Sequence, residues 1–422
     1  MLRVLRSRNV TLLWLGQLIS VIGDWLLFIG LPFAVYERTG STLAAGALFV
    51  VEVVPQVVLG SVAGVLVDRW DRRRTMIAAD LARALVLLPL LGIGGDGWLW
   101  LVYPAAFFQA GFSQFFLPAR SALLPRLVGG GDLAAANGLM ELGDELAFTV
   151  GAAVGGTLLA LIALSALVLI DVASYLLSAL CILLVAVPMA NIDAVNEAPS
   201  SGGSPWRGAL NDWRGGIGLV RSHRAVAAVF AATGVATLAE GLIVVLLVPF
   251  VEEVLDKGAR EFGWLAAARG IGGILGGVVI GYAARKLPLF YLIALAGGLD
   301  GVALLVLFNV SAMPLLLLMM VIAGVAVVNF YVAQQTLLQH TVVHTHLGRV
   351  FGTYAALRGL VLLIGMAFAA GFAETVGVRP LLIVAGALYL VAGALAALLM
   401  SWAGGTSKID IPPEFPSTPM TP

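Results

Sequence analysis

Long hydrophobic stretches alternate with short polar breaks along almost the whole chain. A membrane-spanning helix needs roughly 20 apolar residues, and the pattern predicts twelve such helices. The first six are expected at 10–36, 42–67, 75–93, 98–119, 133–161 and 164–188. The second six are expected at 225–251, 261–284, 288–309, 312–336, 348–373 and 377–402. The sequence therefore predicts an all-α membrane protein of twelve transmembrane helices.

One long polar break, residues 191–222, divides these spans into two sets of six. It contains a Ser-Ser-Gly-Gly-Ser run, two prolines and several arginines. The last residues are rich in proline, serine and threonine, a composition typical of disordered segments. We therefore predict an N-terminal six-helix bundle (1–190), a cytoplasmic linker (191–222), a C-terminal six-helix bundle (223–403) and a disordered cytoplasmic tail (404–422).

Composition excludes most other classes of protein. The chain is 60% hydrophobic and only 11% charged, which no soluble domain tolerates. Cys181 is the sole cysteine, so an intramolecular disulfide and a cysteine-based zinc site are both excluded. The sequence has no phosphate-binding loop and no hydrolase-like Ser/His/Asp arrangement. We expect no enzymatic activity, no cofactor, no metal and no nucleic-acid partner, and we interpret His340, His344 and His346 as an interfacial polar loop.

The distribution of arginines predicts the topology. Loops rich in arginine stay in the cytoplasm, and the arginine-rich breaks here include 69–74, Arg120 with Arg126, and the linker. The breaks between them carry mostly acids or no charge. Both termini are therefore expected in the cytoplasm.

The break after the second span carries the most specific motif. Four arginines lie within residues 69–74, preceded by two glycines and an aspartate. This spacing resembles the loop 2–3 signature of the major facilitator superfamily, with Asp71 where that family usually has glycine, as in macrolide-efflux proteins and the enterobactin exporter. The resemblance implies close helix approach and a cytoplasmic gating cluster; the alternative is a plain topology anchor. The residues concerned are Gly60, Gly64, Asp68, Arg69, Arg72 and Arg73.

A second motif surrounds the start of the fifth span. The run from Pro118-Ala-Arg120 through Asn137 to Gly155-Gly156 resembles the macrolide-efflux branch and covers the place of the superfamily's antiporter signature. Ala152 stands where that signature has proline. The small residues predict tight packing of the fifth span against the eighth. Glu141 and Asp144, followed by Glu145, are expected to oppose Arg120 or the Arg69 cluster as partners in a cytoplasmic gate.

The two halves of the sequence repeat at one common offset. Gly60 recurs as Gly276 and Arg69 as Arg285, while Asp24 in the first span recurs as Glu240 in the seventh. Parallel repeats of six spans are typical of major facilitator proteins, whose substrate site lies near the midplane between the halves.

Asp24 and Glu240 lie about halfway along their spans. An ionisable group at the bilayer centre costs roughly 2.5–3.5 kcal/mol on insertion scales. Neither acid has a basic residue within one helical turn. They are therefore the first candidates for proton coupling or for meeting a cationic substrate. The alternative is that each pairs with an arginine on another helix and only stabilises packing.

Further polar residues are expected around the substrate cavity between the two halves. Glu52 shares a helix face with Gln56, and either lines the cavity or pairs with Arg269 or Arg358. These two arginines are the only basic residues deep in the second half, so each needs an acid, with Glu240, Glu52 and Asp300 available. Asp80 and Arg83 are spaced for a structural pair with each other or with the Arg69 cluster.

The resemblance covers residues 1 to about 402 and implies a transporter that works by alternating access. The expected activity is proton-coupled export of a bulky apolar or amphipathic molecule, such as a drug, macrolide or siderophore. Its expected partners are that substrate, protons and membrane lipids, with a monomeric protein. A lysophospholipid or other lipid transporter is one alternative. A non-transporting scaffold or sensor is another, although it would gain little from keeping acids inside the membrane.

Overall fold

The computed structural model describes residues 4–92, 96–128, 132–186, 218, 220, 223–284, 286–342 and 347–402, and every regular element among them is helical. The first bundle has six long helices and three short 3₁₀ turns, at Val4–Arg6, Leu88–Gly92 and Asp96–Leu101. The long helices are α1 (Arg8–Thr39), α2 (Thr42–Arg69), α3 (Arg72–Leu87), α4 (Val102–Leu127), α5 (Leu133–Leu159) and α6 (Leu164–Leu183).

The second bundle also has six long helices. They are α8 (Arg224–Pro249), α9 (Ala259–Ala283), α10 (Leu289–Leu307), α11 (Met313–Thr341), α12 (Leu347–Val376) and α13 (Val378–Trp402). A π-helical turn, Phe250–Val254, continues α8. The fold class is confirmed. The predicted linker, apart from residues 218 and 220, and the tail from 404 lie outside the described residues.

Helix α4 differs from its prediction. The span was expected to end at 119, but the helix runs to Leu127 with Pro118 and Pro125 inside it. Among the described helices, eleven are long and apolar enough to cross a membrane, and α4 is the long helix outside that set. The helix extends beyond 119 because Arg120 is buried within the bundle and does not lie in a loop. The polar residues of α4 lower its hydropathy and keep it outside the set of eleven.

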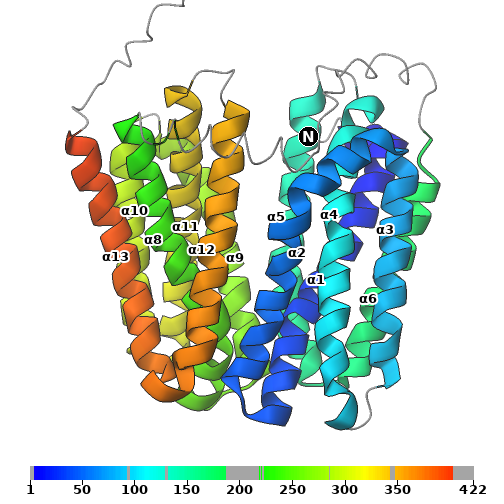
Figure 1. Cartoon of the computed structure of the whole chain (residues 1–422), viewed down its shortest axis with the longest axis horizontal. Helices are drawn as coiled ribbons and strands as arrows, with labels where there is room; N and C mark the ends of the chain where they lie inside the picture. Colours follow the sequence, from blue (N-terminus) through cyan, green and yellow to red (C-terminus); the bar gives the residue numbers. More distant parts are fainter. Residues whose placement is uncertain are drawn as a thin grey trace, which may run out of the picture.

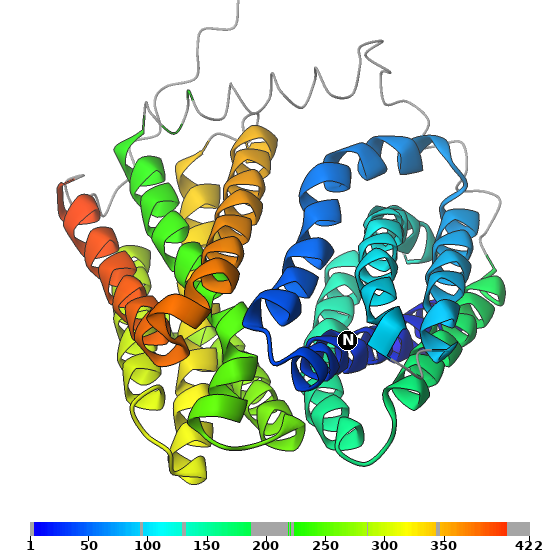
Figure 2. The same cartoon turned by 60° about the horizontal axis from the view of Figure 1, so that its bottom comes forward.

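The two bundles stand side by side and diverge toward the end of the molecule at which α1 begins (Figure 1). We call this the open end. At the opposite, closed end, the bundles contact each other through α5 against α9 and α2 against α12. Figure 2 shows α2 and α12 separating from this contact toward the open end.

Three side-chain contacts join the bundles at the closed end. The Tyr36 hydroxyl at the end of α1 donates a hydrogen bond to the Glu253 carboxylate in the π-helical turn. The rings of Phe33 and Phe262 meet edge to face with centroids 5.7 Å apart. In addition, Ser41 Oγ donates to Glu374 Oε1 at 3.3 Å. The closed end is therefore sealed by both apolar and polar contacts.

Glycines bring α5 and α9 together near the closed end. A Cβ atom on Gly156 would lie 2.2 Å from the carbonyl oxygen of Ala259, and one on Gly263 would lie 2.7 Å from that of Ala152. Such distances leave no room for any side chain. The predicted packing of the fifth span against the eighth is present, and it is backbone against backbone.

Candidate functional site

A cavity of about 310 Å³ lies in the first bundle between α1, α2 and α4. Its wall combines carboxylates, amides and aromatic rings, a mixture suited to an amphipathic molecule. The lining residues are Val21, Asp24, Trp25, Leu27, Phe28, Glu52, Val53, Gln56, Ala106, Gln109, Ala110, Ser113 and Gln114.

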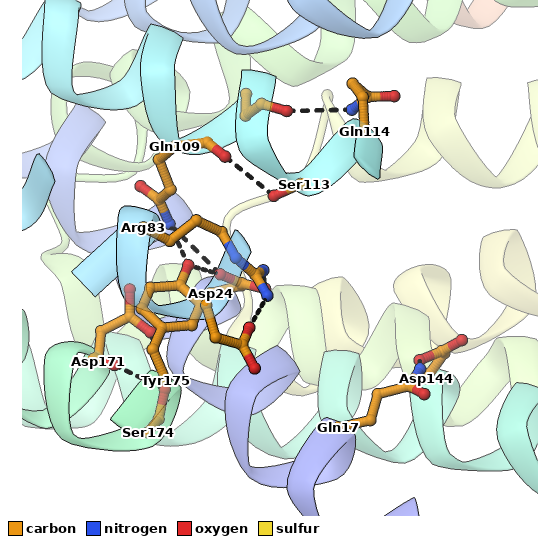
Figure 3. A network of polar contacts seen from close by, with 12 residues as sticks. Gln17, Asp24, Arg83, Gln109, Ser113, Gln114, Asp144, Asp171, Ser174 and Tyr175 are labelled. Carbon is orange, nitrogen blue, oxygen red and sulfur yellow. Dashed lines mark hydrogen bonds and ion pairs between the residues drawn. The ribbon is translucent and has the colours of Figure 1, made fainter. Parts of the chain in front are cut away.

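Asp24 of α1 joins this cavity to a polar network behind it (Figure 3). Its side chain is 30% exposed. Oδ1 accepts hydrogen bonds from the Tyr175 hydroxyl and, at 3.3 Å, from Gln109 Nε2. Oδ2 lies 3.6 Å from Nη1 of Arg83 on α3. Asp24 therefore has a cation on another helix, a partner that the one-dimensional pattern did not reveal.

Arg83 is the cation at the centre of the network. It donates a hydrogen bond to Asp80 one turn earlier on α3, so the predicted pairing of these two residues is present. Its guanidinium carbon also lies 4.9 Å from the ring centroid of Phe116 and 4.3 Å from that of Tyr175. The aromatic contacts fix the guanidinium between the two acids and add a cation–π attraction.

Asp171 of α6 is a further member of the network that sequence reasoning missed. It is fully buried. Ser174 Oγ donates to its Oδ1 at 3.0 Å, while Oδ2 has no hydrogen-bond partner among the described residues. A Cβ on Gly23 would lie 2.2 Å from Oδ1, so Asp171 packs directly against α1 beside Asp24. An aspartate inside an apolar run was the available signal.

Glu52 of α2 is the second acid that lines the cavity. It lines the cavity with Gln56, as the shared helix face predicted. Among the described residues it forms no ion pair, so the alternative pairing with Arg269 or Arg358 is not formed. In the described network of this bundle, Arg83 therefore acts on three acids, Asp24, Asp80 and Asp171. Glu52 adds a fourth acid close to Asp24.

The second bundle holds Glu240 differently. Glu240 Oε2 accepts a hydrogen bond from the Tyr331 hydroxyl at 2.8 Å and lies 3.4 Å from Arg358 Nη2. The guanidinium carbon of Arg358 is 4.1 Å from the Tyr331 ring centroid. Asp24 and Glu240 thus repeat as acids with a tyrosine and an arginine, but those partners come from different helices in the two bundles.

Arg269 and Asp300 form the second charged set of this bundle. Asp300 of α10 is fully buried, and neither of its carboxylate oxygens has a hydrogen-bond partner among the described residues. Arg269 of α9 interacts electrostatically with both Asp300 and Glu240. Two arginines therefore face two acids in this cluster, whereas the cluster of the first bundle has an excess of acids.

The arginine-rich stretch between α2 and α3 lies at the open end (Figure 1). Arg73 Nε donates to the Ile182 carbonyl at 3.0 Å, and its Nη2 donates to the Leu183 carbonyl, so Arg73 caps the end of α6. Arg72 is partly exposed, and Gly60 is in the upper half of α2 without a close neighbour at its Cβ position. The surroundings of Gly64, Asp68 and Arg69, and all of Arg285, lie outside the described part of the chain.

The expected gate partners on α5 also pair within the first bundle. Asp144 Oδ2 lies 3.2 Å from Arg120 Nη1, and Asp144 Oδ1 accepts a hydrogen bond from Gln17 Nε2 at 2.6 Å. Glu141 is exposed on α5. In this conformation the Arg120–Asp144 ion pair ties α4 to α5 and does not join the two bundles.

The family model of the Major Facilitator Superfamily matches residues 13–239 and 229–414, so the chain belongs to this superfamily. It is a multi-pass membrane transporter and not an enzyme. Within the superfamily it is a member of the macrolide-efflux-like branch, as the motifs in residues 60–74 and 118–156 predicted.

Two curated relatives support this placement. Macrolide efflux protein A of Streptococcus pyogenes is 25% identical over 387 residues, covering 90% of this chain and 92% of the relative. The multidrug efflux pump Tap of Mycolicibacterium fortuitum is 27% identical over 415 residues, covering 92% and 95%. Among solved structures, a bacterial homologue of the iron transporter ferroportin in an inward-facing state matches with a TM-score of 0.73, 16% identity, and coverage of 94% and 99%.

Proposed function

We propose that this transporter exports a bulky apolar or amphipathic small molecule, such as a drug, macrolide or siderophore, in exchange for protons. The observation that carries the proposal is the cavity between α1, α2 and α4. Asp24 and Glu52 face the same space as Trp25 and Phe28. The aromatic rings suit an apolar body, and the carboxylates suit a basic group or a proton.

The names of the relatives favour export. One is a macrolide efflux protein and the other a multidrug efflux pump, and both align over nearly their whole length. A polyspecific exporter also fits a cavity wall built mostly of apolar and amide side chains.

In the proposed mechanism, Asp24 carries the exchanged proton and Glu240 is the corresponding acid of the second bundle. Protonation of Asp24 removes its charge and its attraction to Arg83, which keeps Asp80 as a partner. Protonation of Glu240 likewise weakens its attraction to Arg358. Substrate enters the deprotonated state, and proton binding favours the other orientation of the bundles.

The proposed orientation puts the open end and both termini in the cytoplasm of a bacterial cell, with the protein in its plasma membrane as a monomer. The arginines at the ends of α2 and α4 support this orientation by the positive-inside rule. The structure then corresponds to an inward-facing state. When the open end closes, the cluster from Gly60 to Arg73 and the acids Glu141 and Asp144 form the gate, while Glu52, Arg269 and Arg358 border the transport path.

The test uses sealed proteoliposomes that contain a pH-sensitive dye, with an imposed proton gradient. Macrolides, cationic dyes, a catecholate siderophore and lysophospholipid are added in turn. We expect substrate-triggered proton movement with one of the first three, lost in Asp24→Asn and in Asp24→Asn with Glu240→Gln. Full activity in the double variant would contradict proton coupling through these acids. Transfer of labelled lysophospholipid without proton movement would instead establish a lipid transporter.

A further inference from the structure

The network around Arg83 has more buried acids than its one cation can neutralise. Asp80 and Asp171 are both fully buried, and Arg83 is only 3% exposed. Arg83 already donates to Asp80 and lies 3.6 Å from Asp24. A buried carboxylate without its own cation costs several kcal/mol, and such a group takes up a proton instead.

Asp171 is the acid left without a cation. It forms no ion pair with another described residue, and its one side-chain donor, Ser174 Oγ, is shared with the carbonyl oxygen of Asp171 itself at 2.7 Å. The charged groups that act on it are Asp24 from α1 and Asp80 and Arg83 from α3. On its own helix, Ser174 and Tyr175 are the polar neighbours. Two of these three charges are negative.

We propose that Asp171 is a second proton-binding site of the first bundle, occupied in this conformation, and that it exchanges its proton with the cavity through Asp24. The exchange rests on the proposed proton coupling, whereas the occupancy does not. The site takes a proton and no larger ligand, because a Cβ on Gly23 would already lie 2.2 Å from Asp171 Oδ1.

Tyr175 is hydrogen-bonded to Asp24 and interacts electrostatically with Asp171. It follows Asp171 by one helical turn and therefore shares its face of α6. Its hydroxyl donates to Asp24 Oδ1 and accepts from Gln109 Nε2 at 2.7 Å (Figure 3). Asp24 is the partly exposed member of this group, and Asp171 is the buried one.

The exchange conserves charge. When the proton leaves the carboxyl group of Asp171 and binds to the carboxylate of Asp24, an O–H bond breaks on one acid and forms on the other. One negative charge moves from α1 to α6, while Arg83 stays hydrogen-bonded to Asp80. Asp24 in the cavity wall thereby becomes neutral without release of a proton to solvent.

Infrared difference spectroscopy on the purified transporter, at neutral pH and without substrate, tests the occupancy. We expect Asp171→Asn to lose one C=O stretching band of a protonated carboxylic acid relative to wild type. Glu141→Gln is the matched control, because Glu141 is exposed on α5 and its removal leaves that band in place. An unchanged band in Asp171→Asn would overturn the proposal.

Ser174→Ala gives a second readout if the first variant does not accumulate. Loss of the hydroxyl that donates to Oδ1 shifts the frequency of the same band when Asp171 is protonated. An identical protonated-carboxyl region in Ser174→Ala and wild type would overturn the proposal as well.

The dependence of stability on pH gives the third test. A group that holds its proton more firmly in the folded than in the unfolded state stabilises the fold at low pH, and this stabilisation is lost as pH rises. We therefore expect the melting temperature of wild type to fall as pH rises from about 4, where an aspartate of the unfolded chain ionises, to neutral pH. Asp171→Asn should flatten that fall. An equally steep fall in the variant would contradict the proposal.

These measurements separate the inference from the proposed function. If no substrate drives proton movement but the infrared band is present and assigned to Asp171, the proton coupling fails and the occupied site stands. If proton movement is intact but Asp171→Asn removes no band, the coupling stands and the second site fails.

Discussion

Arg83 on α3 lies 3.6 Å from Asp24 on α1 while it is hydrogen-bonded to Asp80 on its own helix. The same guanidinium thus interacts with Asp24, which faces the cavity, and with Asp80, which is fully buried. The consequence is that the carboxylate in the cavity wall has a buried positive charge directly behind it.

Removing this charge should destabilise the protein strongly. In Arg83→Gln, Asp80 loses its cation in a buried setting, and breaking a buried pair costs about 3–5 kcal/mol. The free energy of unfolding in mixed micelles measures the effect. Arg260→Gln is the control, because the Arg260 side chain is 55% exposed and, among the described residues, contacts Glu261 and the ring of Trp264. Equal losses in the two variants would contradict a buried ion-pair network.

In the second bundle, Glu240 and Arg358 should be energetically coupled. Glu240→Gln leaves Arg358 without its carboxylate, and Arg358→Gln leaves Glu240 with the Tyr331 hydroxyl and the more distant charge of Arg269. The double variant removes both charges, so it should unfold less easily than the sum of the single effects predicts. A double-mutant cycle should give a coupling energy of roughly 0.5–3 kcal/mol. Strict additivity would show that the 3.4 Å contact contributes nothing.

The seal at the closed end should depend on one hydroxyl. Tyr36→Phe removes the donor to Glu253 across the two bundles. A hydrogen bond to a charged group contributes about 1.5–3 kcal/mol. The fraction of molecules in which the two bundles have separated at the closed end should therefore rise roughly tenfold or more. Maleimide labelling of Ala45→Cys, at a residue that is 1% exposed, measures this population in a Cys181→Ser background.

Tyr103→Phe is the control for that experiment. The Tyr103 hydroxyl donates to the Ala44 carbonyl at 3.1 Å, so this bond stays within the first bundle. Faster labelling in Tyr36→Phe but not in Tyr103→Phe is expected. Labelling that is as slow in Tyr36→Phe as in the parent would rule out a role for the Tyr36–Glu253 contact.

The sequence predicted Asp24 and Glu240 as acids inside the membrane, but it did not predict which residues surround them. Asp24 and Glu240 stand out because a charge inside an apolar run is visible in one dimension. Arg83 was paired correctly with Asp80, since that contact follows from helical spacing. Its contact with Asp24 depends on how α1 and α3 are rotated against each other, which no local pattern specifies. Asp171 was missed although it also lies inside an apolar run, and its burial beside Gly23 is visible only in the structure.

The predicted end of the fourth span was wrong for a related reason. Arg120 and Arg126 were interpreted as a cytoplasmic loop, but both lie in α4, as does Pro125. Proline is tolerated in a membrane helix when neighbouring groups satisfy the freed backbone. Arg120 is buried because it pairs with Asp144 of α5. The positive charge of Arg120, which suggested a loop, is paired with a carboxylate on α5, the next long helix in the chain.

A methyl group at the glycine contact should impair both stability and transport. In Gly156→Ala the new Cβ meets the Ala259 carbonyl oxygen at 2.2 Å, so α5 and α9 must separate. Overpacking of this kind costs about 1–3 kcal/mol. If the transport barrier rises by the same amount, the transport rate should fall roughly 5- to 150-fold. Gly277→Ala on α9 is the control, because its Cβ meets nothing within 4 Å. Wild-type transport and melting temperature in Gly156→Ala would contradict this close contact.

The same contact sets how far the rest of α5 can swing. Leu133 and Gly156 lie at opposite ends of this helix, about 35 Å apart at a rise of 1.5 Å per residue. If α5 turns about Gly156 by about 10°, its other end moves by about 6 Å, a displacement similar to one turn of helix. The contact between Gly156 and Gly263 can therefore act as a pivot, at which a small rotation of α5 produces a large displacement at the open end.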